Sequence, residues 1–347
     1  MKFTMESDFA KHVKSGEQFG VYLLYGSQTY LIERYEKLLV KKALDGDMND
    51  FNYHRFLGDS LELQAFYDAV ESLPLFAQGR CVALDLLPDQ VGTGEMKELC
   101  AILGDVPAST CVIVTVKEDP AKKEKWNMLL KACEKAGAAI ELGARRRTDT
   151  LRFLRDRAQK NGCELSSEVG GYLIERCTDD LQLLCNEVDK LCAYAAGREI
   201  GRQDVDAVVS PVLQSQIYDL SKAILRGNYT RAMELVECFF DQREQPSRVL
   251  AVLSGAFCDL YRGFCACQAG VPAAQACAAL GYPKNREFVL KNAISDSSRY
   301  QAGQLGKMLE ALADADFMLK TSGGNERVVL EQTITKLFML AERGSYA

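Results

Sequence analysis

The chain has 347 residues, of which 48% are hydrophobic and 26% charged, a balance typical of a soluble protein that buries a sizeable core. This composition excludes disordered and fibrous classes, and the length predicts two or three domains. Asp and Glu outnumber Lys and Arg by 48 to 42, so the formal net charge is -6 and the chain as a whole is not a basic nucleic-acid coat. The apolar runs have strand length, and the N-terminus lacks the apolar core of a signal peptide. We therefore expect a cytoplasmic protein with no membrane partner.

The cysteines, thirteen in number, are scattered through apolar periodic segments, which indicates free buried thiols and not a disulfide framework. None has the CxxC spacing of a zinc site, and Cys265 and Cys267 form only a CxC. The two histidines, His12 and His54, lie far from that pair in sequence. The sequence therefore predicts no metal site and no cofactor.

Residues 1–143 alternate short β-branched or aromatic runs with amphipathic stretches, which is the pattern of an α/β sheet domain. The strands are expected at residues 21–25, 51–57, 80–87, 111–116 and 138–142. Helical spacing of apolar residues covers 30–44, 61–73 and 96–103. This order predicts a doubly wound domain of about five parallel strands.

After residue 143 the strand-like runs stop and a basic, helix-forming stretch begins. Helical patterns over 148–161, 167–177 and 180–195 predict a three-helix domain at 144–211. Residues 212–347 form a helical pattern throughout and predict an all-helical bundle. Its expected breaks contain glycine or proline: Gly227-Asn228, Gln245-Pro246, Gly270-Val271-Pro272, Gly281-Tyr282-Pro283 and Gly323-Gly324.

The turn after the strand at 21–25 reads LLYGSQTYLIER, where a P-loop protein has a glycine, four residues and Gly-Lys-Ser/Thr at the start of a helix. Alignment on Gly26 puts Leu31, Ile32 and Glu33 at the last three positions. Phosphate binding needs close backbone amides and an ammonium group, whereas Ile32 is uncharged and Glu33 would repel phosphate. We therefore predict a degenerate P-loop that binds no nucleotide.

Other enzyme signatures are missing from the sequence. Asp85 could serve as an acid for magnesium at a strand end, but Leu86 follows it and not a second acid. No GxSxG or HExxH motif occurs. The residues offer no convincing enzyme site, and the turn at Gly26 is expected to be an ordinary helix start capped by Ser27 or Thr29.

The segment SLPLFAQGR places Leu73, Leu75 and Phe76 around Pro74, between a helix and the third expected strand. Proline fixes the local backbone and moves its predecessor out of the helix, so Leu75 and Phe76 can stand together at the tip of a loop. An exposed Leu-Phe pair is a good anchor for a pocket on a partner. Burial of the pair under the third strand stays the competing interpretation, because apolar side chains are usually buried.

The densest positive patch begins at Arg145-Arg146-Arg147 and continues with Arg152, Arg155 and Arg157. Arg side chains bind phosphates well, so the run is a candidate DNA contact. In a chain of negative net charge, a solvated face or a face against an acidic neighbour is the alternative.

The order of parts resembles the delta-subunit family of bacterial DNA polymerase III clamp loaders over essentially the whole chain. The similarity is carried by VYLLYGSQTYLIER, SLPLFAQGRCVAL, DDLQLLCNEVDKLCAYA, IYDLSKAILRGNYTRAMELVECFFDQREQPSRVLAVLSGAFCDLYRG and DADFMLKTSGGNERVVLEQTITKL. The resemblance implies an α/β plus all-α protein. It would have an AAA+-like (P-loop NTPase-like) parallel-sheet domain at 1–143, a three-helix lid at 144–211 and a helical oligomerisation collar at 212–347.

The family's clamp-binding element is a Leu-Phe pair in the same slot, related to the pentapeptide Gln-Leu-Ser/Asp-Leu-Phe with which polymerases grip the sliding clamp. Ser72-Leu73-Pro74-Leu75-Phe76 matches it except for Ser72 in place of Gln and Pro74 in the middle. The missing Gln removes a side-chain hydrogen bond, which predicts a lower affinity. The resemblance thus implies Leu73, Pro74, Leu75 and Phe76 as the clamp-binding residues and favours the anchor over the core interpretation.

The implied role is a non-catalytic subunit of the DNA polymerase III holoenzyme, a DNA-directed DNA polymerase and nucleotidyltransferase complex. It would open the beta sliding clamp for loading on primed DNA and would contact the tau/gamma and delta-prime subunits through the collar, with Arg145 to Arg147 facing DNA inside the complex. Two alternatives stay open. An ATP-hydrolysing AAA+ remodeller with an aberrant P-loop would bind nucleotide, and a sequence-specific DNA-binding regulator would shift duplex DNA in a gel.

Overall fold

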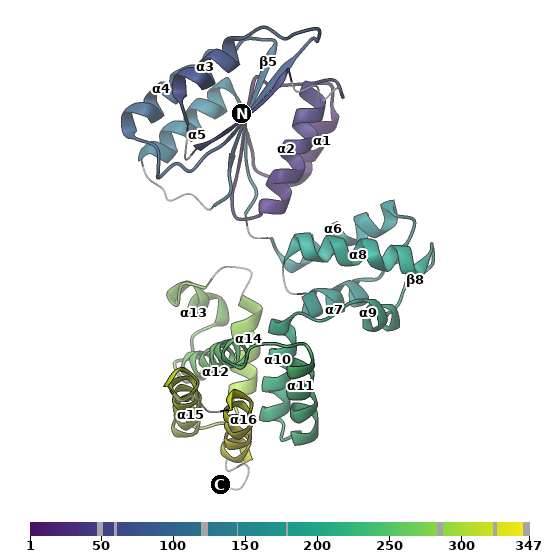
Figure 1. Cartoon of the computed structure of the whole chain (residues 1–347), viewed down its shortest axis with the longest axis vertical. Helices are drawn as coiled ribbons and strands as arrows, with labels where there is room; N and C mark the ends of the chain where they lie inside the picture. The colour runs from purple at the N-terminus through teal and green to yellow at the C-terminus, as the bar shows by residue number, and fades with distance from the viewer. Residues whose placement is uncertain are drawn as a thin grey trace. The chain divides into compact units, whose positions relative to one another are not determined.

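The structure is a computed structural model that describes residues 1–46, 51–58, 61–118, 124–143, 145–177, 180–282, 287–321 and 325–342. The chain divides into two compact units, Met1–Ala144 and Arg145–Ala347 (Figure 1). The further division of the second unit at residue 211 stays a prediction.

The first unit is built on a six-stranded parallel sheet with the strand order β1-β6-β2-β5-β4-β3. The strands are β1 (Lys2–Phe3), β2 (Val21–Tyr25), β3 (Tyr53–Leu57), β4 (Arg80–Asp85), β5 (Thr110–Val116) and β6 (Gly137–Glu141). Every residue of β2 and β5 is buried, as expected for central parallel strands covered on both faces. The predicted number of about five strands is corrected to six, because the two residues of β1 are too few to give a sequence pattern.

Helices cover both faces of this sheet (Figure 1). One face carries α1 (Glu6–Lys14) and α2 (Thr29–Ala43), and the other carries α3 (Leu63–Glu71), α4 (Thr93–Leu103) and α5 (Glu124–Ala136). Buried side chains of the second group, such as Phe66, Met96 and Leu129, pack on the sheet in one cluster. Helices α1 and α5 were not predicted, although each buries three residues, as the predicted helix α3 also does.

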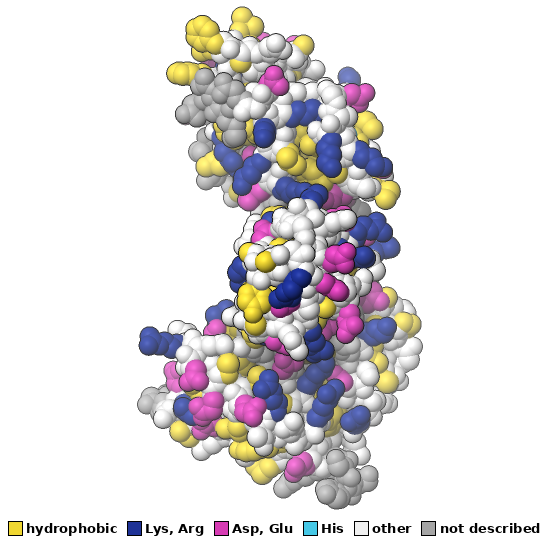
Figure 2. Space-filling model, turned by 90° about the vertical axis from the view of Figure 1, so that its right-hand side faces the viewer, with side chains coloured by type: hydrophobic (Ala, Val, Ile, Leu, Met, Phe, Trp, Pro, Cys, Tyr) yellow, Lys and Arg dark blue, Asp and Glu magenta, His cyan; other side chains and the backbone are white. Residues whose placement is uncertain are grey.

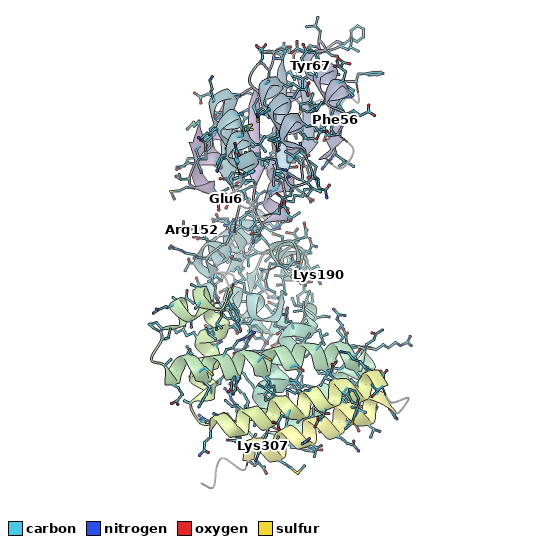
Figure 3. The ribbon with its side chains drawn as sticks, turned by 90° about the vertical axis from the view of Figure 1, so that its left-hand side faces the viewer. Glu6, Phe56, Tyr67, Arg152, Lys190 and Lys307 are labelled. Carbon is cyan, nitrogen blue, oxygen red and sulfur yellow. The ribbon has the colours of Figure 1, made fainter. Side chains whose placement is uncertain are left out.

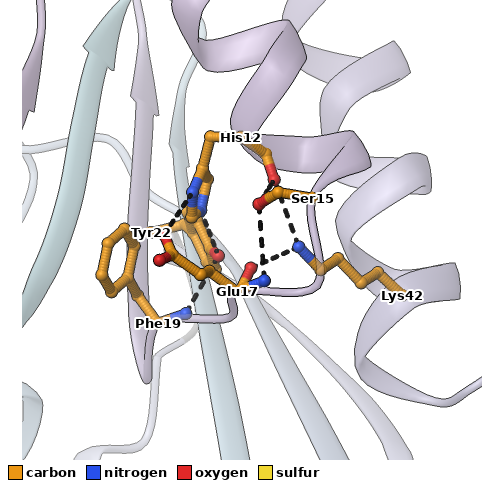
Figure 4. A network of polar contacts seen from close by, with 6 residues as sticks. All are labelled: His12, Ser15, Glu17, Phe19, Tyr22 and Lys42. Carbon is orange, nitrogen blue, oxygen red and sulfur yellow. Dashed lines mark hydrogen bonds and ion pairs between the residues drawn. The ribbon is translucent and has the colours of Figure 1, made fainter.

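A buried polar network ties α1 and α2 to the start of β2 (Figure 4). The hydroxyl of Tyr22 accepts a hydrogen bond from the Phe19 N–H at 3.0 Å and lies 2.9 Å from Nε2 of His12. Lys42 of α2 donates to the backbone carbonyls of His12, at 3.3 Å, and of Glu17. Burial lowers the pKa of His12 and raises the pKa of Tyr22 to about 12, so both side chains are held neutral at physiological pH.

The second unit begins with helices that share one core around Leu154, Leu173 and Leu184. These are α6 (Arg147–Lys160), α7 (Ser167–Cys177), α8 (Leu181–Ala195) and α9 (Arg202–Val208), together with a two-stranded parallel sheet of β7 (Glu164–Leu165) and β8 (Glu199–Ile200). The three predicted helices are confirmed to within one residue at each end. The short helix α9 and the small sheet are additions that the pattern did not predict, because their elements have only seven and two residues.

The remaining helices are α10 (Leu213–Leu225), α11 (Tyr229–Asp241), α12 (Pro246–Gln268), α13 (Ala273–Ala279), α14 (Glu287–Ser297), α15 (Ala302–Thr321) and α16 (Glu326–Glu342). Helices α10, α11, α12, α15 and α16 form a bundle around a separate core that includes Leu220, Phe239, Leu253, Met308 and Leu337. Helices α13 and α14 pack against α12 around a smaller cluster of Ala266, Ala276, Cys277 and Leu290. The breaks predicted at 227–228, 245–246 and 270–272 are confirmed, whereas Pro283 and Gly323-Gly324 lie outside the described residues. A further break at 298–301, between α14 and α15, was not predicted.

Among the described helices, α12 alone is long and apolar enough, by length and composition, to cross a membrane. Its side chains Leu250, Leu253, Phe257 and Leu260 are instead buried in the bundle core, against residues of α10, α15 and α16. Packing within the protein therefore accounts for the apolar character of α12.

Candidate partner-binding site

The turn after β2 lies at the carboxyl edge of the sheet, where open α/β proteins bind their ligands. Gly26 has a φ of 129°, and a Cβ at this position would lie 2.5 Å from the carbonyl oxygen of Leu142. The close approach of these two segments of the backbone therefore requires glycine. The backbone N–H of Gln28 donates to the same oxygen at 2.9 Å. Leu31 and Ile32 are buried in the core, which gives them a packing role.

Helix α2 has Gln28 as its N-cap, and the Gln28 side chain makes no capping hydrogen bond. The predicted cap by Ser27 or Thr29 is therefore wrong. Backbone hydrogen bonds to the end of β6 hold this turn in place of a side-chain cap.

Charged side chains fill the carboxyl edge next to this turn. Lys117, directly after β5, places Nζ 2.8 Å from Oδ2 of Asp85 and 3.5 Å from Oε1 of Glu33. Arg55 of β3 lies 3.4 Å from Oε1 of Glu36 and 3.7 Å from Oδ2 of Asp85. Asp85, the acid that the sequence offered for magnesium, thus faces two protein cations, which compensate its charge without a metal ion.

Burial raises the pKa of Glu36 within this cluster, and Arg55 partly offsets the increase. Lys117, Arg55 and Glu36 were missed by the sequence reasoning. Lys117 directly follows β5, Arg55 lies inside β3 and Glu36 lies inside α2, so no shared sequence position marks these residues, and which charges meet depends on the strand order.

The Leu73–Phe76 segment lies at the opposite, amino edge of the sheet, because it connects the end of α3 to the start of β4. Its side chains are exposed: the relative solvent accessibility is 78% for Leu73 and 51% for Leu75, and Phe76 is fully exposed. The competing interpretation, in which Leu75 and Phe76 belong to the core, is therefore wrong. A role for the segment in clamp binding stays a prediction.

The backbone at Phe76 has a φ of 56°, in the left-handed region that aromatic residues rarely adopt. Such a conformation costs on the order of 1 kcal/mol and persists only where the surroundings hold it. Phe51, next to the start of β3, and Tyr67 of α3 are also exposed (Tyr67 is labelled in Figure 3). A group of exposed apolar side chains on and beside one loop is typical of a protein-binding surface.

Two arginines at the start of the arginine run, Arg145 and Arg147, contact neighbouring groups. Arg145 lies over the Phe153 ring at 5.1 Å, and Arg147 donates to the Gly171 carbonyl at 3.0 Å and to Glu175 at 2.8 Å. Arg146 is exposed. On the face drawn in Figure 2, Lys and Arg side chains are interspersed with Asp and Glu. The DNA contact at Arg145, Arg146 and Arg147 stays a prediction. Of the three residues, Arg146 is the best candidate for such a contact.

The thiols and acids of the described residues form no recognisable metal site. Most of the thirteen cysteines are buried, as their positions in apolar segments predicted. Across the described ranges, no group of three or more His, Cys, Asp or Glu side chains is placed to hold a metal ion.

These features define a class of protein: a parallel α/β domain with Leu31, Ile32 and Glu33 after its first long strand, extended by helical units and carrying an exposed Leu-Phe loop. Two family models match the chain, "DNA polymerase III, delta subunit" over residues 22–140 and the C-terminal domain of the same subunit over residues 214–337. The chain belongs to the DNA polymerase III delta subunit family, whose members are subunits of the clamp loader in DNA replication.

Two relatives match almost the full length of the chain. DNA polymerase III subunit delta of Bacillus subtilis (strain 168) is 26% identical over 351 residues, which cover 98% of this chain and 99% of the relative. The solved structure of the Bacillus subtilis DNA clamp loader delta protein has a TM-score of 0.73 at 22% identity, and the match covers 96% of this chain and 100% of the other. The predicted fold class and the resemblance are thereby confirmed.

Proposed function

We propose that this chain binds the beta sliding clamp through Leu73, Pro74, Leu75 and Phe76, and that it opens the ring for loading on primed DNA without hydrolysing nucleotide. The observation that carries the proposal is the Leu75-Phe76 pair, which is exposed at a loop tip in a protein of the clamp-loader delta family. An exposed Leu and Phe lose water-accessible apolar area only when a partner covers them, which favours binding.

Ring opening needs no chemistry in this chain. A protein that binds the open form of a ring more tightly than the closed form shifts the equilibrium toward the open form by the ratio of the two affinities. A rigid loop tip meets this requirement, because a clamp surface that changes shape on opening can fit the tip in only one of its states. The energy for release must then come from other subunits.

The partners follow from the same proposal. The collar helices at 212–347 would join the tau/gamma and delta-prime subunits, whose nucleotide cycle would expose or withdraw the Leu75-Phe76 tip. Arg146 would face primed DNA within the complex, beside Arg145 and Arg147. The complex would work in the cytoplasm, where bacterial DNA is replicated.

The residues at the carboxyl edge of the sheet argue against the alternative function, an ATP-hydrolysing remodeller. Ile32 aligns with the P-loop lysine and is buried, and the Lys117 ammonium lies 2.8 Å from Oδ2 of Asp85. Binding of nucleotide there would have to displace ion pairs at 2.8 to 3.7 Å.

The test mixes the full-length chain with the sliding clamp of the same organism, labelled with a donor and an acceptor fluorophore on the two sides of one ring interface. Binding is followed by surface plasmon resonance and opening by loss of energy transfer. We expect both signals without nucleotide. Absence of binding would overturn the proposal, and binding with unchanged energy transfer would overturn the opening step.

A further inference from the structure

We propose that Asn52 is a positioning residue that holds the Leu75-Phe76 loop in the conformation that a partner binds. This inference rests on the proposed function and deepens it, because it assigns the residue that presents the anchor. Asn52 itself is buried and would not touch the clamp.

The Asn52 side chain makes two hydrogen bonds to the backbone of a single loop residue. Its Oδ1 accepts from the Leu75 N–H at 2.8 Å, and its Nδ2 donates to the Leu75 carbonyl at 2.8 Å. The amide thereby satisfies both backbone groups of Leu75, as a neighbouring strand would do. The residue that follows is Phe76, with its positive φ and its fully exposed ring.

The sheet fixes Asn52 in turn. Its backbone carbonyl accepts from the Cys81 N–H at 2.9 Å, one step before the register pair of Tyr53 and Cys81 that joins β3 to β4. The residue keeps only 2% of its reference area. A short polar side chain that is buried and anchored at its own backbone has little freedom, so it can transmit the rigidity of the sheet to the loop.

Two other buried polar side chains support the helix that leads into the loop. Arg80, the first residue of β4, donates Nε to the Ala69 carbonyl at 2.8 Å, and Thr110, the first residue of β5, donates Oγ1 to the Val70 carbonyl at 3.0 Å. These carbonyls belong to the last turn of α3, where helical partners are missing. The amino ends of three adjacent strands therefore hold α3 and Leu75 together, and the loop tip projects from this support.

The physical reason for such a support is preorganisation. An exposed loop that carries a left-handed Phe would populate other conformations, and its apparent affinity would fall in proportion to the fraction in the binding-competent one. Two hydrogen bonds from a buried amide raise that fraction before any partner arrives. Asn52 is thus assigned to the loop and not to general stability, because its side-chain hydrogen bonds go to Leu75.

The test uses the full-length chain and two variants at Asn52. Asn52→Ala removes both hydrogen bonds, whereas Asn52→Asp keeps the oxygen that accepts from the Leu75 N–H and loses the donor to the Leu75 carbonyl. In the free protein, hydrogen exchange of residues 73–79 should accelerate about tenfold or more in Asn52→Ala, and its affinity for the clamp should fall about tenfold. Asn52→Asp should lie between Asn52→Ala and the wild type in both measurements.

Two controls separate positioning from folding. Ile113→Val trims the buried core of β5 without touching the loop, so it should lower the melting temperature while exchange at 73–79 and clamp affinity stay at the wild-type value. Thr110→Val removes only the bond to Val70, so exchange should rise in the last turn of α3 and not at Leu75. If Ile113→Val and Asn52→Ala have the same melting temperature and lose clamp affinity to the same extent, the loss follows from lower stability, and the inference is overturned.

The result can also be told apart from a failure of the proposed function. Unchanged exchange at 73–79 in Asn52→Ala would overturn the positioning role without any use of the clamp. Normal affinity in Asn52→Ala beside lost affinity in the Leu75→Ala/Phe76→Ala variant would overturn the positioning role and leave the anchor intact. Normal affinity in that double variant would overturn the proposed function itself.

Discussion

Replacing Leu75 and Phe76 together by alanine should weaken clamp binding strongly and leave the fold almost unchanged. The two side chains are exposed at the loop tip, so the free protein makes little use of them. Their apolar surface would be buried when the clamp binds, because a pocket on the clamp would cover it.

The exposed fractions set the magnitude. Full burial of a Leu or Phe side chain contributes roughly 1.5 to 3 kcal/mol. Phe76 is fully exposed and can contribute the whole of this, whereas Leu75 is 51% exposed and can contribute about half. Together they should supply about 2 to 4.5 kcal/mol, which is on the order of fiftyfold to two-thousandfold in Kd.

The effect on folding should be much smaller. Substitution of exposed side chains usually changes the free energy of unfolding by about 0.5 kcal/mol, and the buried half of Leu75 adds about 1.5 kcal/mol at most. If both residues were core, the same change would cost about 5 kcal/mol or more. A melting curve therefore distinguishes the two situations.

The assay pairs thermal melting with a surface plasmon resonance titration against the clamp. Leu57→Ala is the matched control, because Leu57 is 53% exposed and lies at the other end of β3. It should bind the clamp like the wild type. A large drop in melting temperature in the double variant, or an equal loss of affinity in the control, would refute the reasoning.

Three further predictions concern the rest of the first unit. The purified chain should bind no Mg-ATP in equilibrium dialysis, and magnesium-dependent binding at micromolar concentration would revive the remodeller alternative. Lys117→Met should lower the free energy of unfolding by about 1 to 3 kcal/mol, because it removes one of the two cations that face Asp85. The control Lys97→Met changes an exposed lysine and should leave the free energy of unfolding unchanged. Equal midpoints of urea unfolding for the two variants would contradict this prediction. His12 has a folded-state pKa below its ordinary value of 6.5, so the unfolded chain takes up the proton first and stability should fall as pH drops below about 6.5. Urea unfolding at several pH values measures this, and an unaltered pH slope in His12→Gln would show that another group is responsible.

The two edges of the sheet in the first unit carry different kinds of side chains. At the carboxyl edge, ion pairs of Lys117 and Arg55 take the place in which P-loop proteins hold phosphate and metal. At the amino edge, buried polar side chains hold a loop whose apolar tip faces solvent. Because these edges lie at opposite ends of the same strands, the ion pairs at one edge place no constraint on partner binding at the other.

Periodicity located most of the long elements. The spacing of apolar residues predicted α2, α7 and α8 to within one residue and α3 to within two residues at each end, since each buries one stripe of side chains against a core. It missed the seven-residue helix α9, and it missed α1 and α5 although these bury as many residues as α3. Two-residue strands such as β1 exist only through pairing with a distant strand, which no local pattern records.

The sequence by itself determined the class of this protein. Ile32 and Glu33 in the P-loop slot argued against phosphate binding because charge and reach are properties of residue types. The ordered segments identified the family, and Pro74 showed that Leu75 and Phe76 follow a helix end. Each of these inferences depends on neighbours in the chain.

The tertiary structure decided whether Leu75 and Phe76 are core or surface, and which side chains hold them. Asn52, 23 residues upstream, meets Leu75 only because β3 pairs with β4 in one register. Lys117 meets Asp85 only because β5 lies beside β4. Contacts of this kind depend on strand order and register, which arise from the packing of the whole domain, so the sequence reasoning could name the anchor but not the residues that present it.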